Sequence, residues 1–233
     1  MINIQKYKDL GKLNISWLKA NYHFSFSNYY NPKRTGFGKL LVINDDIVKV
    51  GGGFETHPHK DMEIITYIRS GAITHEDSQG NIGRTEAGDV QVMSAGTGIY
   101  HSEQNKENED TRLYQIWIEP HTKGVKPTWD TCQFPKKTYE NSLPLIVSGR
   151  EEDKTKKVLH INQYASVYGG TIKSGTTINH TIKDQAYLLV SKGEIDLEGN
   201  IINTGDGAEI TGIKNITITA KTESEVIIID VPE

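Results

Sequence analysis

The sequence has a single cysteine, few prolines and no long apolar run, and these shortages exclude several classes of protein. Because Cys132 is the only cysteine, the chain can form neither an internal disulfide nor an all-cysteine zinc site, and we expect a reducing, cytoplasmic setting. The longest apolar run, from Ala186 to Val190, is far too short to span a bilayer, and no apolar core of a signal peptide follows Met1. We therefore expect no contact with membranes.

Positive charge is not in excess either. The 233 residues include 26 lysines and arginines against 30 aspartates and glutamates, which gives a net charge of −4. This balance provides no strong positive field for a phosphate backbone, so direct binding to nucleic acid is not expected. With 36% hydrophobic residues the chain is typical of a globular protein, and its length suits one large all-β domain or two small ones.

Glycine is abundant, and short β-branched runs lie between the glycines. The sequence has 22 glycines and 7 prolines, whereas stretches with helical periodicity are scarce. Many short strands separated by turns predict an all-β sandwich or barrel. The predicted strands are Leu40–Ile43, Ile64–Ile68, Val90–Met93, Leu113–Ile118, Leu145–Val147, Ser166–Ile172, Tyr187–Val190, Asn200–Ile202, Ile216–Thr219 and Val226–Ile229.

A weak internal repeat relates the two halves of the chain. His59 precedes Gly71 by twelve residues, His180 precedes Gly193 by thirteen, and an apolar strand lies inside each interval. A Gly-Asn turn and a Gly-Asp pair then follow in the same order, at Gly80-Asn81 and Gly88-Asp89 and again at Gly199-Asn200 and Gly205-Asp206. The shared order favours a duplication, although a glycine-rich chain also produces such matches by chance. The charged stretch between the halves, Arg150–Lys157, is expected to be an exposed loop.

Two short motifs carry the residues of a possible metal site. In a strand, His57-Pro-His59 places both imidazoles on one face, and His101-Ser-Glu103 does the same for an imidazole and a carboxylate. If the two strands are neighbours, three neutral nitrogens and one anionic oxygen converge. This ligand set suits a divalent first-row metal and leaves coordination positions open, as in catalytic sites.

Glu63 has the same parity as the histidines but lies about 13 Å further along an extended strand. It ligates the metal only if the strand turns. The alternatives are a hydrogen-bond acceptor that holds an imidazole tautomer and a simple surface position.

These residues carry a resemblance to a known family. The pattern Gly51-x5-His57-x-His59-x3-Glu63-x7-Gly71 closely resembles the first cupin motif. The longer stretches resemble the pirin family, and the Lys-Asp-Met run after His59 resembles its bacterial quercetinase-like branch. Those stretches are Trp17 with His23–Pro32, His57–Glu63, Gly88–Glu103 and Leu113–Ile118, and they cover most of residues 15 to 120.

The resemblance implies an all-β bicupin with two tandem jelly-roll β-barrels and a metal only in the first. The expected domains are 1–135, with the metal site, and 136–233, without metal ligands. The family's ligands fall on His57, His59, His101 and Glu103, whereas Glu63 is not a ligand in pirins. In the second half only His180 of the ligand set remains, so a second metal site is not expected.

The bacterial branch implies a quercetin 2,3-dioxygenase-like oxidoreductase. A flavonol, or another enolic or phenolic compound, would bind with dioxygen at the metal, and Glu103 would act as both ligand and base. Fe(II) is the first expectation for the metal, and Mn, Co, Ni, Cu or Zn also suit these ligands. The alternative, implied by eukaryotic pirins, is a non-catalytic regulator whose metal oxidation state alters a surface for a protein partner. A monomer is expected.

Other residues receive minor roles. Four apolar residues that flank the motifs are assigned to the barrel core, with cavity walls as the alternative: Phe54, Ile65, Met93 and Tyr100. Three histidines lack a paired ligand and are expected to face solvent or to be hydrogen-bonded: His75, His121 and His160. Gly51-Gly52-Gly53 precedes a strand rather than a helix, so we expect close packing against the metal strand and not a phosphate site.

Overall fold

The computed structural model describes residues 1–134 and 136–233, and almost all regular secondary structure in this part of the chain is β-strand. All ten strands predicted from the sequence are confirmed, because their apolar, β-branched runs fill the interior of the sheets. No helix among the described residues is long and apolar enough to cross a membrane.

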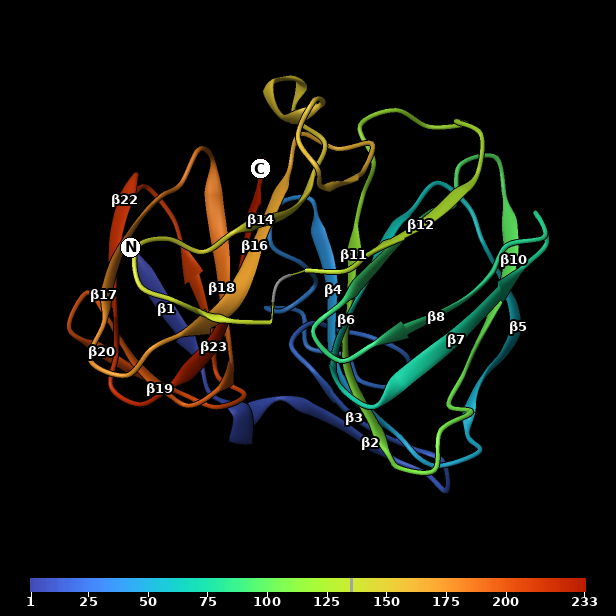
Figure 1. Cartoon of the computed structure of the whole chain (residues 1–233), viewed down its shortest axis with the longest axis horizontal. Helices are drawn as coiled ribbons and strands as arrows, with labels where there is room; N and C mark the ends of the chain where they lie inside the picture. The colour runs from blue at the N-terminus through green and yellow to red at the C-terminus, as the bar shows by residue number, and fades with distance from the viewer. Residues whose placement is uncertain (135) are drawn as a thin grey trace. The chain divides into compact units, whose positions relative to one another are not determined.

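Contacts divide the chain into two compact units, which we call the N-terminal barrel and the C-terminal barrel. The N-terminal barrel comprises Gly11–Pro135 and Thr155–Gln163, and the C-terminal barrel comprises Met1–Leu10, Lys136–Lys154 and Tyr164–Glu233. This division differs from the expected ranges, 1–135 and 136–233, at the first ten residues and at Thr155–Gln163. At the first ten residues, β1 lies among the strands of the C-terminal barrel (Figure 1). It pairs with β21, with Ile2 opposite Ile210. The expected boundary adjoins Pro135, which lies outside the described residues.

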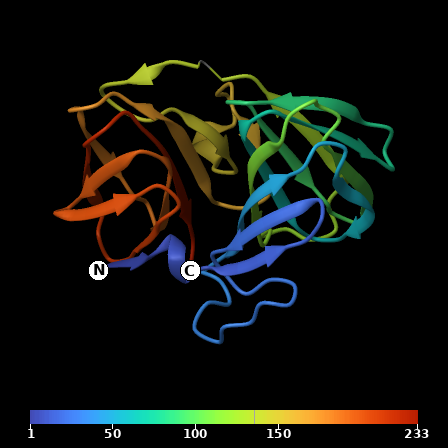
Figure 2. The same ribbon diagram turned by 90° about the horizontal axis from the view of Figure 1, so that it is seen from below.

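The N-terminal barrel contains two antiparallel sheets. The strands of these sheets are β2 (Gly11–Asn14), β3 (Leu18–Tyr22), β4 (Leu40–Val48), β5 (Gly53–His59), β6 (Glu63–Ser70), β7 (Ala72–Asp77), β8 (Ile82–Glu86), β9 (Val90–Ser94), β10 (Ile99–Gln104), β11 (Thr111–Ile118) and β12 (Thr128–Cys132). The unit also contains β15 (Leu159–His160), which is in neither of the two sheets. The larger sheet runs β12-β9-β6-β11-β4-β3-β2, and the smaller sheet runs β5-β10-β7-β8. The long loop between β3 and β4 projects from this barrel (Figure 2).

The C-terminal barrel repeats this arrangement. Its elements are β1 (Ile2–Gln5), η1 (Tyr7–Asp9), β13 (Thr138–Tyr139), β14 (Leu145–Ser148), η2 (Glu151–Asp153), β16 (Ser166–Ile172), β17 (Thr177–Thr181), β18 (Gln185–Lys192), β19 (Glu194–Leu197), β20 (Asn200–Asn203), β21 (Gly207–Ile210), β22 (Asn215–Ala220) and β23 (Ser224–Val231). The order β17-β22-β19-β20 matches β5-β10-β7-β8 strand for strand, and β21-β18-β23-β16 matches β9-β6-β11-β4. The structure therefore supports the duplication indicated by the weak sequence repeat.

The predicted hairpin tips lie close to their expected positions. Gly80 has a φ of +87° in the turn between β7 and β8, a conformation that glycine adopts without strain. In the second hairpin the two residues with positive φ are Glu198 and Gly199, while Asn200 already belongs to β20. That turn therefore lies one residue earlier than predicted.

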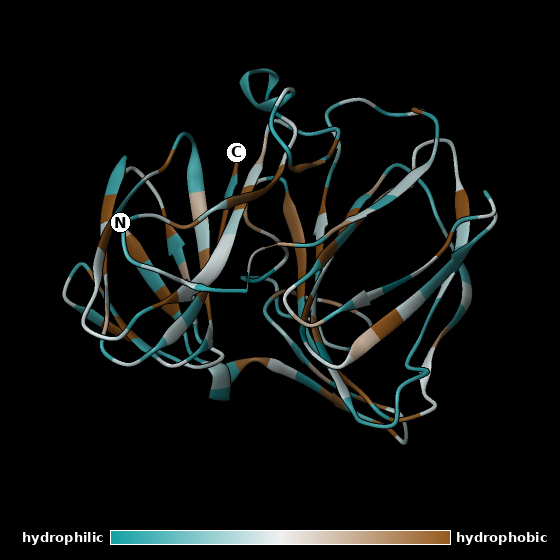
Figure 3. Cartoon of the chain, viewed as in Figure 1, coloured by the Kyte–Doolittle hydropathy of each residue, from teal (hydrophilic) through white to brown (hydrophobic). Residues whose placement is uncertain are grey.

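Each barrel encloses its own apolar core, and polar residues dominate most of the loops (Figure 3). In the C-terminal barrel, β23 contributes four consecutive fully buried residues, Val226–Ile229. The charged stretch Arg150–Lys157 is only partly the exposed loop that we expected. Glu151 and Glu152 are exposed, but Arg150 is buried because its guanidinium donates to the buried carboxylate of Asp230.

Candidate metal centre

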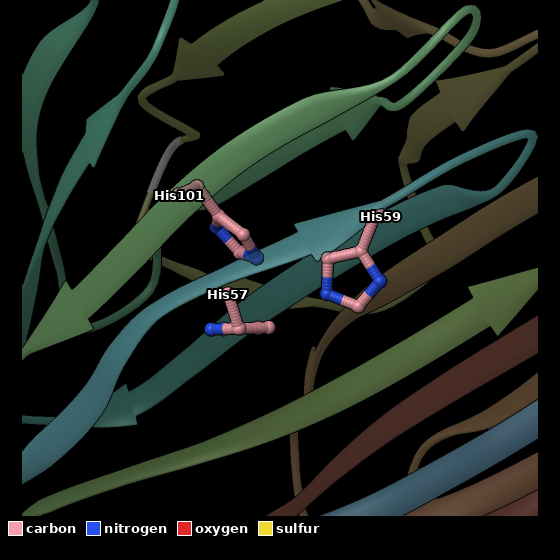
Figure 4. Close-up of side chains that lie close together, drawn as sticks. All are labelled: His57, His59 and His101. Carbon is pink, nitrogen blue, oxygen red and sulfur yellow. The ribbon is translucent and has the colours of Figure 1, made fainter.

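The candidate metal centre lies where β5 and β10 pair. The antiparallel register places His101 opposite His57 and Ile99 opposite His59. Because alternate residues of a strand share a face, the two histidines of β5 point into the same space as the one from β10. One potential ligand atom from each of the three histidines lies within 4.8 Å of the others (Figure 4). The two His motifs thus come together as the sequence indicated.

Glycine permits the close approach of these strands. A Cβ on Gly53 would lie 2.5 Å from the backbone oxygen of Glu103, and one on Gly52 would lie 2.8 Å from Cβ of Trp17. Both distances are shorter than real contacts allow, so a side chain at either position would force a shift of its surroundings. The pairing also contains an irregularity, since Glu103 lies opposite Phe54 although His101 lies opposite His57. The glycine run therefore packs β5 against β10, as predicted.

The protonation of the histidines suits metal binding. Burial and the neighbouring His57 lower the pKa of His59 to about 4, and burial together with three neighbouring histidines holds the pKa of His101 well below its usual value. Both rings are thus neutral at physiological pH. Nε2 of His101 is buried without a hydrogen-bond partner among the described residues. Nδ1 of His57 lies 2.6 Å from the carbonyl oxygen of Glu55, which can only accept, so Nδ1 carries a proton.

Glu103 lies on the same face of β10 as His101 but is not part of the three-histidine cluster. The carboxylate is buried and accepts hydrogen bonds from three side chains. Gln91 donates to Oε1 over 2.6 Å, Thr66 donates to the same oxygen over 3.1 Å, and Gln115 donates to Oε2. Burial raises the pKa of Glu103 to about 7 even though these donors favour the anion. Its role as the fourth ligand stays a prediction.

A cavity of about 570 Å³ opens beside the histidines. This volume lies in the range of sites for drug-sized ligands. Aromatic rings form much of its wall: Trp117 packs edge-on against His59 with ring centroids 4.9 Å apart, and Trp17 packs edge-on against Phe54 at 5.1 Å. His57, His59 and Glu103 line the same cavity. The cavity wall beside the histidines is therefore largely aromatic.

Two polar residues of β4 also line the cavity. Asn44 and Asp46 are two residues apart on the strand, and both are almost completely buried. Burial, with the nearby carboxylates of Asp45 and Glu103, raises the pKa of Asp46 well above its usual value. One cavity wall is consequently polar, and its surroundings disfavour the ionised form of Asp46.

Several expectations about single residues require correction. Glu63 is buried and accepts hydrogen bonds from Ser94, over 2.6 Å, and from Asn162, over 3.3 Å. The surface position is therefore wrong, and neither of these two side-chain donors is an imidazole. Of the four flanking apolar residues, Phe54 lines the cavity, Ile65 and Met93 are buried in the interior, and the Tyr100 side chain is 58% exposed.

The three histidines without a paired ligand were expected to face solvent or to be hydrogen-bonded, and each does one or the other. His121 and His160 are exposed, whereas His75 is fully buried and hydrogen-bonded close to His101. In the C-terminal barrel, His180 occupies β17, the strand that corresponds to β5. Its ring packs edge-on against Tyr168, with centroids 4.7 Å apart, and burial lowers its pKa to about 4.

Gln91 and Gln115 are functional residues that sequence reasoning missed. Each is a polar residue within a strand that is otherwise buried and largely apolar, β9 or β11. An unpaired amide inside such a strand costs free energy, so its presence signals a buried polar partner. Here the partner of both is Glu103.

Comparisons with known proteins agree with this architecture. A family model described as Pirin matches residues 3–118, and one described as Quercetinase C-terminal cupin domain matches residues 145–231. The chain is 46% identical over 232 residues to a Pirin-like protein of Caulobacter vibrioides, and the match covers 99% of both proteins. It is 39% identical over 235 residues to a protein of Escherichia coli strain K12 named Quercetin 2,3-dioxygenase, with 100% of this chain and 99% of that protein covered.

A solved structure is also similar over the whole length. It is the bacterial pirin YhhW of Escherichia coli in complex with nickel(II), with a TM-score of 0.92, 38% identity, and coverage of 100% of this chain and 99% of that one. With full-length relatives at this level of identity and family models matching both halves, the chain belongs to the pirin family of bicupin proteins.

Proposed function

We propose that this protein is a metal-dependent dioxygenase that cleaves a flavonol such as quercetin. The observation that carries the proposal is the three-histidine cluster of β5 and β10 on the wall of a cavity large enough for a flavonol. The name of the Escherichia coli relative, Quercetin 2,3-dioxygenase, supports the same activity. A purely regulatory metal site would not need an aromatic-lined cavity of this size.

The donor set fits one divalent transition metal. His57, His59 and His101 would hold it, with Glu103 as the fourth ligand, and neutral imidazoles suit several first-row metals. The buried, unpartnered Nε2 of His101 is the observation on which this fit rests, because an unpaired buried nitrogen is costly unless it binds something. We propose Fe(II) as the first candidate. Nickel(II), which the related YhhW structure contains, is the second.

A bound metal would supply a positive charge that favours the oxyanion of a phenolic or enolic hydroxyl. The chain's own residues supply the other functions. Glu103 would accept the proton of that hydroxyl on a carboxylate oxygen, since it lines the cavity beside the histidines. Gln91, Thr66 and Gln115 hold the carboxylate in place through their hydrogen bonds. Trp117 and Phe54 would orient the flat substrate and exclude water from the reacting end.

The overall reaction balances without a further reductant. The flavonol is the electron donor, dioxygen is the oxidant, and the central ring opens by cleavage of two carbon–carbon bonds. One carbon leaves as carbon monoxide and keeps the oxygen of its own hydroxyl, and both oxygen atoms of dioxygen enter the remaining product, one at its ester carbonyl and one at its new carboxylate.

The proposal is tested by adding quercetin to metal-loaded protein, first without oxygen and then in air. We expect a shift of the flavonol absorption band without oxygen, and in air the loss of the band with release of carbon monoxide. His101→Ala should abolish both effects, whereas His160→Ala, which changes an exposed histidine, should abolish neither. Absence of both effects with Fe, Mn, Co, Ni and Cu would refute the proposal for this substrate.

A further inference from the structure

A series of hydrogen-bonded side chains connects the candidate ligand His101 to a buried carboxylate. Nδ1 of His101 lies 3.5 Å from Nδ1 of His75, and Nε2 of His75 lies 3.0 Å from Oδ2 of Asp77. His75 and Asp77 come from β7, which pairs with β10 and places His101 opposite Asp77. The side chains of His75 and Asp77 are both fully buried, so water does not compete for these contacts.

The surroundings fix the orientation of His75. Its ring stacks on Trp129 with centroids 4.9 Å apart and planes inclined by only 9°. A Cβ on Gly83 would lie 2.1 Å from the Trp129 ring, so glycine at that position makes room for the indole. Asp77 is held as well, because it also accepts from the side chain of Asn81 over 2.9 Å. The imidazole therefore has one available position.

The donors and acceptors in the series His101–His75–Asp77 allow one consistent placement of the imidazole protons. A carboxylate only accepts, so Asp77 receives the proton on Nε2 of His75. A neutral imidazole has one N–H, which leaves Nδ1 of His75 as an acceptor for the N–H on Nδ1 of His101. The remaining nitrogen of His101, Nε2, then carries a lone pair, and this is the buried atom without a partner among the described residues.

We propose that His75 and Asp77 are positioning residues that fix the tautomer and orientation of His101 so that its Nε2 lone pair faces the metal centre. The inference rests on the proposed function in that it takes His101 to be a ligand. It adds residues that the family's ligand motif does not contain, and both lie outside the cavity lining. Outer partners of this kind change metal affinity by about 10- to 100-fold.

The first test needs no metal. In the metal-free, nitrogen-15-labelled protein, two-bond proton–nitrogen correlations assign the tautomer of each histidine. We expect the proton of His75 on Nε2 and that of His101 on Nδ1. In His75→Phe, whose ring can still stack on Trp129, His101 loses its acceptor and should shift towards the tautomer with its proton on Nε2. A proton on Nε2 of His101 in the unmodified protein would overturn the proposal.

The second test measures the dissociation constant for Ni(II). His75→Phe should weaken binding by about 10- to 100-fold, and Asp77→Asn should weaken it in the same direction. Asp77→Asn also keeps the test available if His75→Phe does not fold. The control is Asn81→Ala, which removes the other side-chain donor to Oδ2 of Asp77 and should leave binding within about twofold.

The outcomes separate this inference from the proposed function. If His101→Ala retains metal, the proposed ligand set is wrong. The tautomer measurement still shows whether His75 fixes the tautomer of His101. If His101→Ala loses metal but His75→Phe and Asp77→Asn bind as tightly as the unmodified protein, the inference alone fails. If Asn81→Ala weakens Ni(II) binding as much as Asp77→Asn does, the loss of affinity comes from a disturbed turn between β7 and β8. That result would also overturn the proposal that Asp77 positions His75.

Discussion

His180 makes the C-terminal barrel sensitive to acid. In the internal repeat His180 corresponds to His59 of the candidate metal centre, but its ring packs against Tyr168, and its Nε2 has no partner among the described residues. Because burial lowers its pKa from 6.5 to about 4, the folded state disfavours the proton that the unfolded state accepts. The stability linked to this neutral ring is fully present above pH 6.5 and is lost as the pH falls towards 4.

The size of the effect follows from the two pKa values. At pH 5 the unfolded chain is almost fully protonated at His180 and the folded chain is mostly neutral, which lowers the free energy of unfolding by about 2 kcal/mol. Below pH 4 the loss reaches about 3 kcal/mol. His180→Phe keeps a ring against Tyr168 and removes the titrating group. The variant should therefore lose about 2 kcal/mol less than the unmodified protein between pH 7 and pH 5.

The assay must report on the correct barrel. All three tryptophans, Trp17, Trp117 and Trp129, belong to the N-terminal barrel, so their fluorescence does not follow the C-terminal one. Amide hydrogen exchange in β18 and β23 gives the free energy of opening of the C-terminal core at each pH. His160→Asn, at an exposed position, is the control and should leave the pH dependence unchanged. An identical loss in His180→Phe and the unmodified protein would show that His180 does not cause the pH dependence.

Three further predictions concern other positions. Gly53→Ala places a Cβ against the backbone of Glu103, so we expect the protein to lose about 1 to 3 kcal/mol in urea unfolding and to bind metal more weakly; unchanged metal affinity would contradict this. Trp117→Ala removes an aromatic wall and should weaken flavonol binding by about tenfold in a fluorescence titration while metal content stays the same. Arg150→Met leaves the buried Asp230 without its guanidinium donor and should cost about 3 kcal/mol in hydrogen-exchange stability of β23; a neutral effect would show that the backbone donors suffice.

Sequence reasoning predicted the strands that the apolar pattern marks and missed those that it does not. β5 contains Pro58 and mostly polar residues, so its strand character followed only from the spacing of its histidines. The position of β1 could not be predicted at all. It pairs with β21 about two hundred residues away, and no local pattern encodes such a partner.

The same limit explains the partial success at the site. The three histidines were predictable because the spacing within each short motif fixes a common strand face. His75, Gln91 and Gln115 lie on strands other than the two that carry the motifs, and their relation to His101 and Glu103 depends on strand order. A single sequence does not determine that order. Sequence patterns therefore indicated the three histidines but not the side chains that contact His101 and Glu103.

We expect His57, His59 and His101 to hold a metal in the N-terminal barrel. The most direct measurement is the metal content of the purified protein, determined by elemental analysis beside His101→Ala and the control His160→Ala. We expect close to one transition-metal ion per chain in the unmodified protein and in the control, and almost none in His101→Ala. A full complement of metal in His101→Ala would contradict it.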